Sequence, residues 1–299
     1  MKYKIPTVFY FSLISLVSFS QAKNVVIADA IDRSPLPYAT IKVVNKNRGY
    51  YADKNGVVNI LNSQPDSLLI EYVAHVSCNL AINDIADSIF LKRKEYELLP
   101  VEIKTLNTQH ELGSFKRKMF YSLFFSESSE YALKIDLSGI KENYKVKQFF
   151  LPLDINKRTF NDCVVKLHLY KEGDNGTPGE DILNKPLILG KDDFPGNNFY
   201  IDVSAQNLVL SEKYLFVGIE CIISKELNDA ALTGNKAFNQ QSRNSPVSLY
   251  IAKEKQFFDG SYGHTFIRYL NSPSYKWQPD ADSKNPMNIS AGLVILSSQ

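Results

Sequence analysis

The 299-residue sequence has few of the residues that usually mark a catalytic or metal centre. It contains only four histidines and three cysteines, and no two residues of either kind lie close together in the chain. Zinc and thiolate sites usually place such ligands within a few residues of each other. The sequence also has no glycine-rich phosphate loop and no Gly-x-Ser-x-Gly nucleophile turn. We therefore expect no catalytic activity, no catalytic residue and no metal-ligating residue of a familiar kind.

An excess of charge of either sign is also absent. The chain has 34 basic and 32 acidic residues, and two of the basic ones, Lys2 and Lys4, lie at the extreme N-terminus. Nucleic-acid binding proteins concentrate a basic excess on one face. The balance of charge thus argues against nucleic acid as a partner.

Long apolar runs are missing as well. The longest, from Ile5 to Phe19, contains three serines and is shorter than the roughly 20 residues that a membrane-spanning helix needs. It follows two lysines and ends in the small-x-small pattern Ser18-Phe19-Ser20, which is typical of a cleaved secretory signal peptide. We predict that residues 1–20 are a signal peptide and that the mature chain has no transmembrane segment. The protein would be exported to the periplasm or to the outer-membrane or cell surface.

A helical period is lacking from residue 24 to about residue 105. Short alternating runs are separated there by turn residues such as Asp53-Lys54-Asn55-Gly56, in which Gly56 is expected at positive φ. Seven short strands in about 80 residues are typical of an antiparallel sandwich. We predict one β-sandwich over residues 21–106, with strands at Asn24–Ala30, Tyr38–Asn45, Val57–Leu61, Ser67–Val73, Val76–Asn83, Ser88–Leu91 and Val101–Thr105.

Residues 107–130 differ in composition from the segments on either side. The spacing of their apolar residues matches neither the helical period nor the strand period clearly. Phe115, Met119 and Leu123 would share one side of a short amphipathic helix. We predict an inter-domain connector with a helical form left open, and an interaction segment is the alternative.

Alternation returns from residue 131 to residue 299. Lys166 and His168 lie on the parity opposite Val165 and Leu167, which predicts an antiparallel sheet with one wet face and one buried face. We therefore expect an all-β chain whose second domain is another antiparallel β-sandwich. Its predicted strands are Tyr131–Leu137, Tyr144–Leu153, Cys163–Lys171, Leu187–Gly190, Asn198–Ser204, Lys213–Ile223, Val247–Ala252, Thr265–Leu270 and Ile289–Ser297.

The three cysteines all fall on the apolar parity of a predicted strand. The simplest interpretation is three buried thiols that act as small apolar groups. Because an exported protein meets an oxidising compartment, a disulfide between Cys163 and Cys221 across the second sandwich stays open.

Four segments of the first domain carry a family resemblance: Val26–Asp29, Ser34–Val43, Gly49–Ile60 and Asp66–His75. Together they resemble the carboxypeptidase-D regulatory-like domain that begins many exported proteins of Bacteroidetes-type bacteria. The family commonly has a Gly-aromatic pair where this chain has Ala74-His75. The resemblance covers about residues 24–105. It implies a transthyretin- or Ig-like sandwich that serves as a structural or docking module, without peptidase chemistry.

The second half is similar to C-terminal β-domains that accompany this module in uncharacterised exported proteins. The similar segments are Phe150–Leu153, Val165–Tyr170 and Asn175–Leu183. This similarity implies a jelly-roll-like sandwich and brings no catalytic residues with it.

Aromatic residues near the end of the chain are the best candidates for a ligand site. Tyr262, Tyr275 and the single tryptophan, Trp277, lie in or near a long loop. Carbohydrate binders place such rings at loop ends, but a ring that packs against a sandwich edge is the commoner arrangement. Acidic turns such as Asp174-Asn175-Gly176, Asp192-Asp193 and Asp280-Ala281-Asp282 leave structural calcium open, although we favour plain turns and no cofactor.

Taken together, these patterns predict a non-enzymatic, exported envelope protein that acts as a docking module. A carbohydrate-binding module at the cell surface is the first alternative, and it requires exposed, coplanar rings at Tyr275 and Trp277. An enzyme of unrecognised type is the second, and it requires a cleft with convergent carboxylates. The expected partner is therefore an envelope protein or a glycan, and the sequence does not define the oligomeric state.

Overall fold

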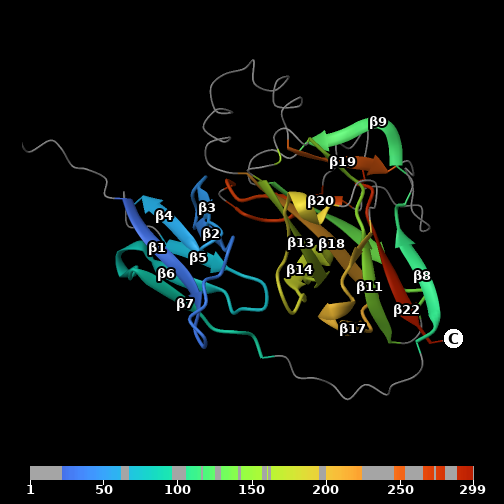
Figure 1. Cartoon of the computed structure of the whole chain (residues 1–299), viewed down its shortest axis with the longest axis horizontal. Helices are drawn as coiled ribbons and strands as arrows, with labels where there is room; N and C mark the ends of the chain where they lie inside the picture. Colours follow the sequence, from blue (N-terminus) through green and yellow to red (C-terminus); the bar gives the residue numbers. More distant parts are fainter. Residues whose placement is uncertain are drawn as a thin grey trace, which may run out of the picture.

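The chain is almost entirely built from β-strands (Figure 1). The computed structural model describes residues 22–61, 67–95, 106–115, 117–124, 129–140, 143–156, 160, 163–194, 200–223, 246–252, 265–272, 274–279 and 288–298. Within them the only helices are single 3-10 turns, at Ile82–Asp84, Asp174–Gly176, Lys191–Asp193 and Ser204–Gln206. No helix of this part of the chain is long and apolar enough to cross a membrane. The predicted signal peptide and the predicted strand Val101–Thr105 lie outside the described residues.

The N-terminal part is a sandwich of two sheets. One sheet has the order β4 (Val57–Leu61), β1 (Ala22–Asp29), β7 (Ser88–Leu91), and the other has the order β3 (Gly49–Tyr51), β2 (Thr40–Val43), β5 (Ser67–Glu71), β6 (Cys78–Ala81). All these pairs are antiparallel except β1 with β7, which is parallel. Gly56 has φ +72° in the turn before β4, as the sequence predicted. Alternate residues such as Val25, Ile27, Ile41 and Ile70 form a dedicated apolar core.

The C-terminal part has a larger set of antiparallel strands. Its main sheet is ordered β14 (Pro178–Asp181), β13 (Cys163–Glu172), β18 (Tyr214–Ile223), β10 (Ser129–Asp136), β20 (Thr265–Tyr269), β21 (Gln278–Pro279), and β15 (Leu187–Leu189) also pairs with β13. The facing sheet is ordered β16 (Tyr200–Asp202), β11 (Tyr144–Phe150), β22 (Gly292–Ser297), β8 (Thr108–Gly113), and β17 (Val209–Leu210) pairs with β11. A third sheet joins β12 (Leu153–Ile155), β19 (Val247–Ala252) and β9 (Arg117–Phe124).

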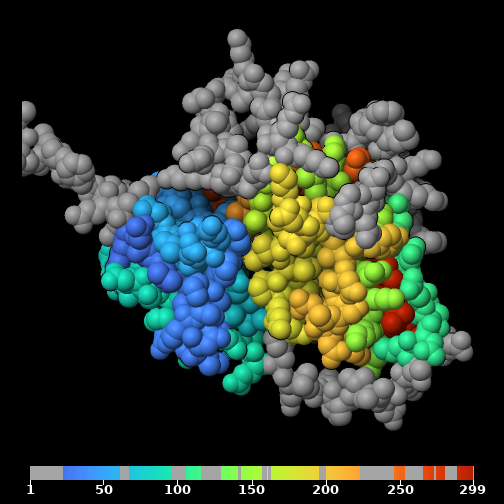
Figure 2. Space-filling view, in the orientation of Figure 1, coloured from blue at the N-terminus to red at the C-terminus, as the bar shows by residue number. Residues whose placement is uncertain are grey.

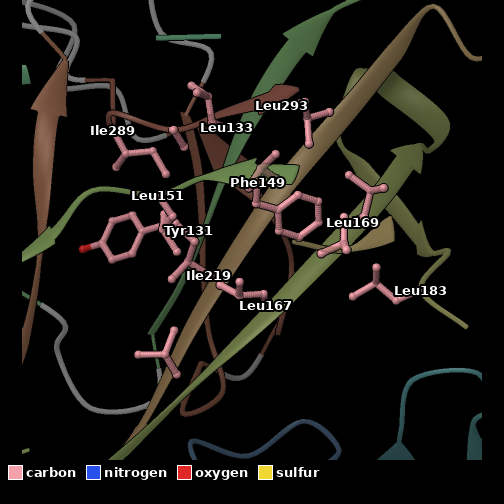
Figure 3. Close-up of a cluster of buried hydrophobic side chains, with 14 of the residues drawn as sticks. Tyr131, Leu133, Phe149, Leu151, Leu167, Leu169, Leu183, Ile219, Ile289 and Leu293 are labelled. Atoms are coloured by element: carbon pink, nitrogen blue, oxygen red, sulfur yellow. The ribbon is translucent and has the colours of Figure 1, made fainter. Parts of the chain in front are cut away.

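The core of the second sandwich lies between its two large sheets. Leu133, Leu167 and Ile219 point inward from the main sheet and meet Phe149 and Leu293 of the facing sheet (Figure 3). Each of these residues is fully buried. The predicted two-residue alternation is thus confirmed on the inner face of both sheets.

The interpretation of residues 107–130 as a connector was wrong in part. The segment forms β8 and β9 and contains no described helix. β8 pairs with β22 in unbroken register from Gly113 with Gly292 to Thr108 with Ser297. Pairing with a strand that lies 180 residues later overrides a weak local preference. Most of this segment therefore belongs to the second sandwich.

The predicted wet face of the second sandwich is also wrong. Lys166 and His168 do lie on the outer face of β13, but they are only 2% and 4% exposed. The first sandwich lies against this face: Lys166 of β13 contacts Thr40 of β2, and Glu220 of β18 contacts Tyr51 of β3 (Figure 1). In the space-filling view the two parts meet without an open gap (Figure 2). Alternation shows which side chains share a face, but not what covers that face.

Candidate functional site

Polar side chains of both sandwiches are buried where the two parts meet. In β2, Ile41 points into its own core, whereas Lys42 points outward. Lys42 Nζ donates to the backbone oxygen of Leu270 at 2.6 Å, and burial lowers the pKa of Lys42. Tyr51 of β3 donates to Glu220 Oε1 of β18, also at 2.6 Å. These side chains thus connect two sandwiches that have separate apolar cores.

The same contact surface contains a partly open cavity of about 70 Å³. Its walls come from β2, from the end of β5 and the following loop, and from the outer face of the main sheet. Four cationic side chains and three carboxylates are among the residues that line it. The lining residues are Thr40, Glu71, Tyr72, Val73, Ala74, His75, Ser77, Lys94, Lys166, His168, Tyr170, Asp181, Glu220, Arg268 and Tyr275. This cavity is the candidate ligand site of the chain.

His168 is the most unusual side chain in the cavity wall. Its Nδ1 lies 2.7 Å from Asp181 Oδ2, and its Nε2 is buried without a hydrogen-bond partner in the described structure. Burial alone would lower the pKa of His168, but Glu130, Asp181 and Glu220 outweigh that effect and raise the pKa to about 9. At neutral pH His168 therefore carries a proton on both nitrogens and is a donor rather than a base.

Glu220 is held as an anion in the same wall. Desolvation opposes its ionisation, yet Lys166 at 3.4 Å, His168 at 3.5 Å and the hydroxyl of Tyr51 hold the pKa of Glu220 far below its usual range. Buried charges persist only when they are paired in this way. The convergent carboxylates that an enzyme would require are therefore present, but Glu220 and Asp181 are engaged by neighbouring cations.

A second buried cluster adjoins the cavity and contains the predicted aromatic residues. Arg268 of β20 donates through Nε to Glu130 at 2.7 Å and through Nη2 to Tyr170 at 3.2 Å. Tyr170 in turn donates its hydroxyl proton to Glu130. The guanidinium carbon of Arg268 lies 4.5 Å from the ring centroid of Trp277 and 4.7 Å from that of Tyr275.

The surroundings of the predicted ligand-binding rings thus differ from those of the exposed, coplanar rings that a carbohydrate site requires. Trp277 and Tyr275 are half-buried, and Trp277 also packs edge-on against Tyr170, with 5.7 Å between the ring centroids. Tyr275 has φ +42° and lines the cavity. Tyr262 lies outside the described residues. The structure therefore brings two of the three predicted residues together, around an arginine.

The cysteine pair lies in the core of the second sandwich. Cys163 and Cys221 are buried on neighbouring strands β13 and β18, with their sulfur atoms 3.3 Å apart as free thiols. The hydrogen bond between Cys163 and Cys221, together with burial, raises the pKa of Cys221. Cys78, by contrast, is only half-buried.

The acidic turns have ordinary structural roles where they are described. Asn175 and Gly176 both have positive φ in the turn after β13, as Asn-Gly turns require. Asp193 accepts a hydrogen bond from the backbone N–H of Gly190. Among the described residues no group of three or more His, Cys, Asp or Glu side chains could hold a metal ion. Asp280 and Asp282 lie outside the described residues.

A separate feature lies at one corner of the first sandwich, where β1 ends. The carboxylate of Asp29 is 1% exposed and accepts hydrogen bonds from the backbone N–H of Ile31 and of Asp32. It also pairs with His75 Nε2 at 3.0 Å and with Arg93 Nε. Although burial opposes ionisation, Arg93 and these other donors hold the pKa of Asp29 well below its usual range. One buried carboxylate thus fixes three chain segments.

These three segments present exposed apolar side chains. Ile31 is 71% exposed, Val76 is 51% exposed and Phe90 is 43% exposed. The backbone N–H of Ala30 donates to Leu91, and that of Val76 donates to Lys92, so the segments are direct neighbours. We call the surface formed by Ile31, Val76 and Phe90 the Asp29 corner.

Comparisons with known proteins leave the family open. No family model matches the chain. No curated protein matches it either. Among solved structures, the chain is similar at 8% sequence identity and a TM-score of 0.24 to "Crystal structure of infectious bursal disease virus VP2 subviral particle". The match covers 93% of this chain and 65% of the viral chain. A score this low supports no conclusion about fold or function.

The cavity and the Asp29 corner were not recognised from the sequence. The residues that line the cavity range from Thr40 to Tyr275, and no local spacing joins them. One signal was present: Lys166, His168 and Tyr170 form a polar and aromatic series on the outer parity of a strand whose inner parity is apolar. A charged, ring-rich face on a long central strand is a reason to expect a covering partner.

Proposed function

We propose that this chain is a non-enzymatic, exported envelope protein that docks a partner protein at the Asp29 corner. The observation that supports this proposal is the set of exposed apolar side chains of Ile31, Val76 and Phe90. The buried, hydrogen-bonded carboxylate of Asp29 holds their chain segments in place. Exposed apolar residues that lie singly are normal, but several on neighbouring, firmly held segments are typical of an interaction surface.

The adjoining sheet edge supports a protein partner rather than a small molecule. The sheet that contains β1 ends at β7 in the described part of the chain. Phe90 lies on this last strand, with the guanidinium of Arg33 4.0 Å from its ring centroid. An edge strand offers backbone groups to an added strand, and neighbouring side chains supply specificity. The partner would thus add an extended segment along β7 and cover Phe90 and Ile31.

Site-specific photo-crosslinking in cells that export the protein tests this proposal. A photoreactive phenylalanine analogue replaces Phe90, and in a control it replaces Tyr200, another exposed aromatic residue that lies in the second sandwich. We expect position 90 to capture one envelope protein reproducibly and position 200 not to capture it. Ile31→Ser, at a 71% exposed position, should weaken that capture without affecting folding. Equal capture at both positions, or none at position 90, would contradict the docking role.

Carbohydrate binding remains a second candidate, because Trp277 and Tyr275 are only half-buried and border the cavity region. The face of each ring that Arg268 approaches is occupied, so a sugar would have to use another face or edge. Trp277→Ala should abolish retention on an envelope-glycan column if this role is real, and Phe90→Ala should leave it unchanged. Retention that is insensitive to Trp277→Ala would remove the candidate.

A further inference from the structure

His75 is buried between two hydrogen-bond acceptors beside the Asp29 corner. Its Nδ1 lies 2.9 Å from the backbone oxygen of Val73, and its Nε2 lies 3.0 Å from Asp29 Oδ2. The side chains of His75 and Asp29 are only 7% and 2% exposed. Bulk water is therefore a poor substitute for either contact, and the ring must satisfy both acceptors itself.

The carboxylate of Asp29 is a pure acceptor in this arrangement. Its Oδ2 accepts from Arg93 Nε as well as facing His75, and its Oδ1 accepts from the backbone N–H groups of Ile31 and Asp32. Donors at both oxygens favour the carboxylate anion, which has no proton to give. Nε2 of His75 must therefore carry a proton, and Nδ1 must carry another to donate to the backbone carbonyl. The geometry thus requires the doubly protonated, positively charged imidazolium.

The charges around Asp29 agree with this state. Arg93 pairs with Asp29 through Nε and with Asp32 through Nη2. Two carboxylates therefore share one guanidinium, and the imidazolium of His75 supplies the second positive charge. Loss of its proton would leave one negative charge in excess, and it would set a nitrogen lone pair against an oxygen atom in a buried place, which is unfavourable.

His75 also connects the parts of the docking surface. Through Asp29 it ties the segment that contains Val76 to the end of β1, next to Ile31, across 46 positions in the chain. We propose that protonation of His75 controls docking at the Asp29 corner. When the ring loses a proton, one of its two contacts is lost, and Val76 is held less firmly beside Ile31. Since the charge of an imidazole changes between about pH 5 and pH 8, docking should be strongest at the acidic end of that range. This inference rests on the docking function proposed above.

Other titratable groups face His75 from each neighbouring element. The ring of Tyr72 packs edge-on against the imidazole, with 5.3 Å between the centroids, and burial raises the pKa of Tyr72 to about 12. On the cavity side lie two more tyrosines and His168, whose pKa is raised to about 9. Carboxylates, lysine and arginine ordinarily titrate outside pH 5–8, so a transition within that range reports on His75. The charged residues of these types on the cavity side are Glu71, Lys94, Lys166, Asp181, Glu220 and Arg268.

Nitrogen NMR of the full-length mature protein with ¹⁵N-labelled histidine measures the protonation state directly. The two ring nitrogens resonate close together in an imidazolium and far apart in a neutral ring. We expect His75 to give the imidazolium pattern at about pH 5 and the neutral pattern at about pH 8. The signal that is absent from His75→Gln identifies the residue. A ring that is neutral at the lower pH, or still doubly protonated at the higher pH, would overturn the proposal.

The same pH series in cells measures the effect on docking. Cells that carry the photoreactive analogue at position 90 are suspended in buffers from about pH 5 to pH 8 and irradiated. We expect capture at position 90 to fall about fivefold across the series, with the midpoint of the His75 titration. His75→Gln should remove this pH dependence. His110→Gln is the matched control and should retain it, because His110 faces Ser297 in the second sandwich.

The outcomes separate the regulation from the docking role. Capture that does not vary with pH, or that varies equally in His75→Gln, would overturn control by His75 and leave the docking role intact. Absence of capture at every pH would contradict the docking role and this proposal with it. Because the NMR titration follows the unmodified ring, that part of the test does not depend on how well a variant folds.

Discussion

Ala74 adopts a strained backbone conformation in the wall of the interdomain cavity. Its φ of +60° lies in the left-handed region, which costs a residue with a Cβ about 1–2 kcal/mol. Its carbonyl oxygen accepts a hydrogen bond from Lys94, which holds the loop in this shape.

We expect Ala74→Gly to raise the free energy of unfolding by about 0.5–1 kcal/mol, because relief of strain exceeds the added flexibility of the unfolded chain. Urea denaturation measures this change. Ala81→Gly is the matched control: Ala81 has an ordinary φ of −70°, so glycine there should destabilise the protein by about 0.5–1 kcal/mol. A destabilising effect of equal size at both positions would show that Ala74 is not strained.

His168 links the stability of the protein to pH. Its pKa is raised from 6.5 to about 9 in the folded state, so its contribution is complete below pH 6.5 and is lost as the pH rises through 9. The shift corresponds to at most about 3 kcal/mol. We expect the stability difference between the wild type and His168→Gln to shrink by an amount of this order between pH 6 and pH 10. Urea unfolding at several pH values measures it, and a difference that does not vary with pH would contradict the charged state of His168.

Strands β13 and β18 place Cys163 and Cys221 close enough for a redox test. Their sulfur atoms are 3.3 Å apart, so a small rotation brings them to bonding distance. The raised pKa of Cys221 suppresses its thiolate, so oxidation of the folded protein should be slow. We expect refolding in a glutathione redox buffer to yield a Cys163–Cys221 disulfide, detected as a loss of about 2 Da by peptide mass spectrometry. The bridge should be absent from folded, reduced protein that is exposed to the same buffer for a short time. Rapid bridging of the folded protein, or none during refolding, would be the contrary result.

Strand β3 touches the second sandwich at a position where only glycine fits. A Cβ on Gly49 would lie 2.2 Å from Leu270 Cγ, whereas a Cβ on Gly139 meets nothing within 4 Å. Gly49→Ala should therefore destabilise the protein by about 1–3 kcal/mol through overpacking. Gly139→Ala should be neutral or slightly stabilising. Equal effects in thermal unfolding would mean that the two sandwiches do not contact each other at Gly49.

The same elements show what the sequence could predict. β4, β7 and β19 have the predicted bounds, because alternation and turn residues are local properties. β8 and β9 were not predicted, because partners distant in the sequence determine their pairing. The cavity and the Asp29 corner depend on how sandwiches and loops meet, and period-two patterns carry no information about that. Lys166 and His168 were assigned to the correct face but to the wrong surroundings.

At the scale of the whole molecule, the two sandwiches share one buried polar surface. Hydrogen bonds cross this surface from Lys42 and Tyr51 of the first sandwich and from Lys166 of the second. Glu220, which accepts from Tyr51, also pairs with Lys166. Separation of the sandwiches would leave these polar groups without their partners. Loss of one partner of a buried pair is strongly destabilising. The cavity exists only while the two parts hold one fixed arrangement. We therefore expect them to unfold together.

Trp277 reports on this arrangement directly, because it is the single tryptophan of the chain and packs against Arg268 and Tyr170 beside the cavity. The decisive measurement is urea unfolding of the mature protein, followed by tryptophan fluorescence and by far-UV circular dichroism on the same samples. The docked arrangement predicts coincident transitions with one midpoint. If Trp277 emission changes at a lower urea concentration than the circular dichroism signal, the sandwiches separate before they unfold, and the shared polar surface does not hold them together.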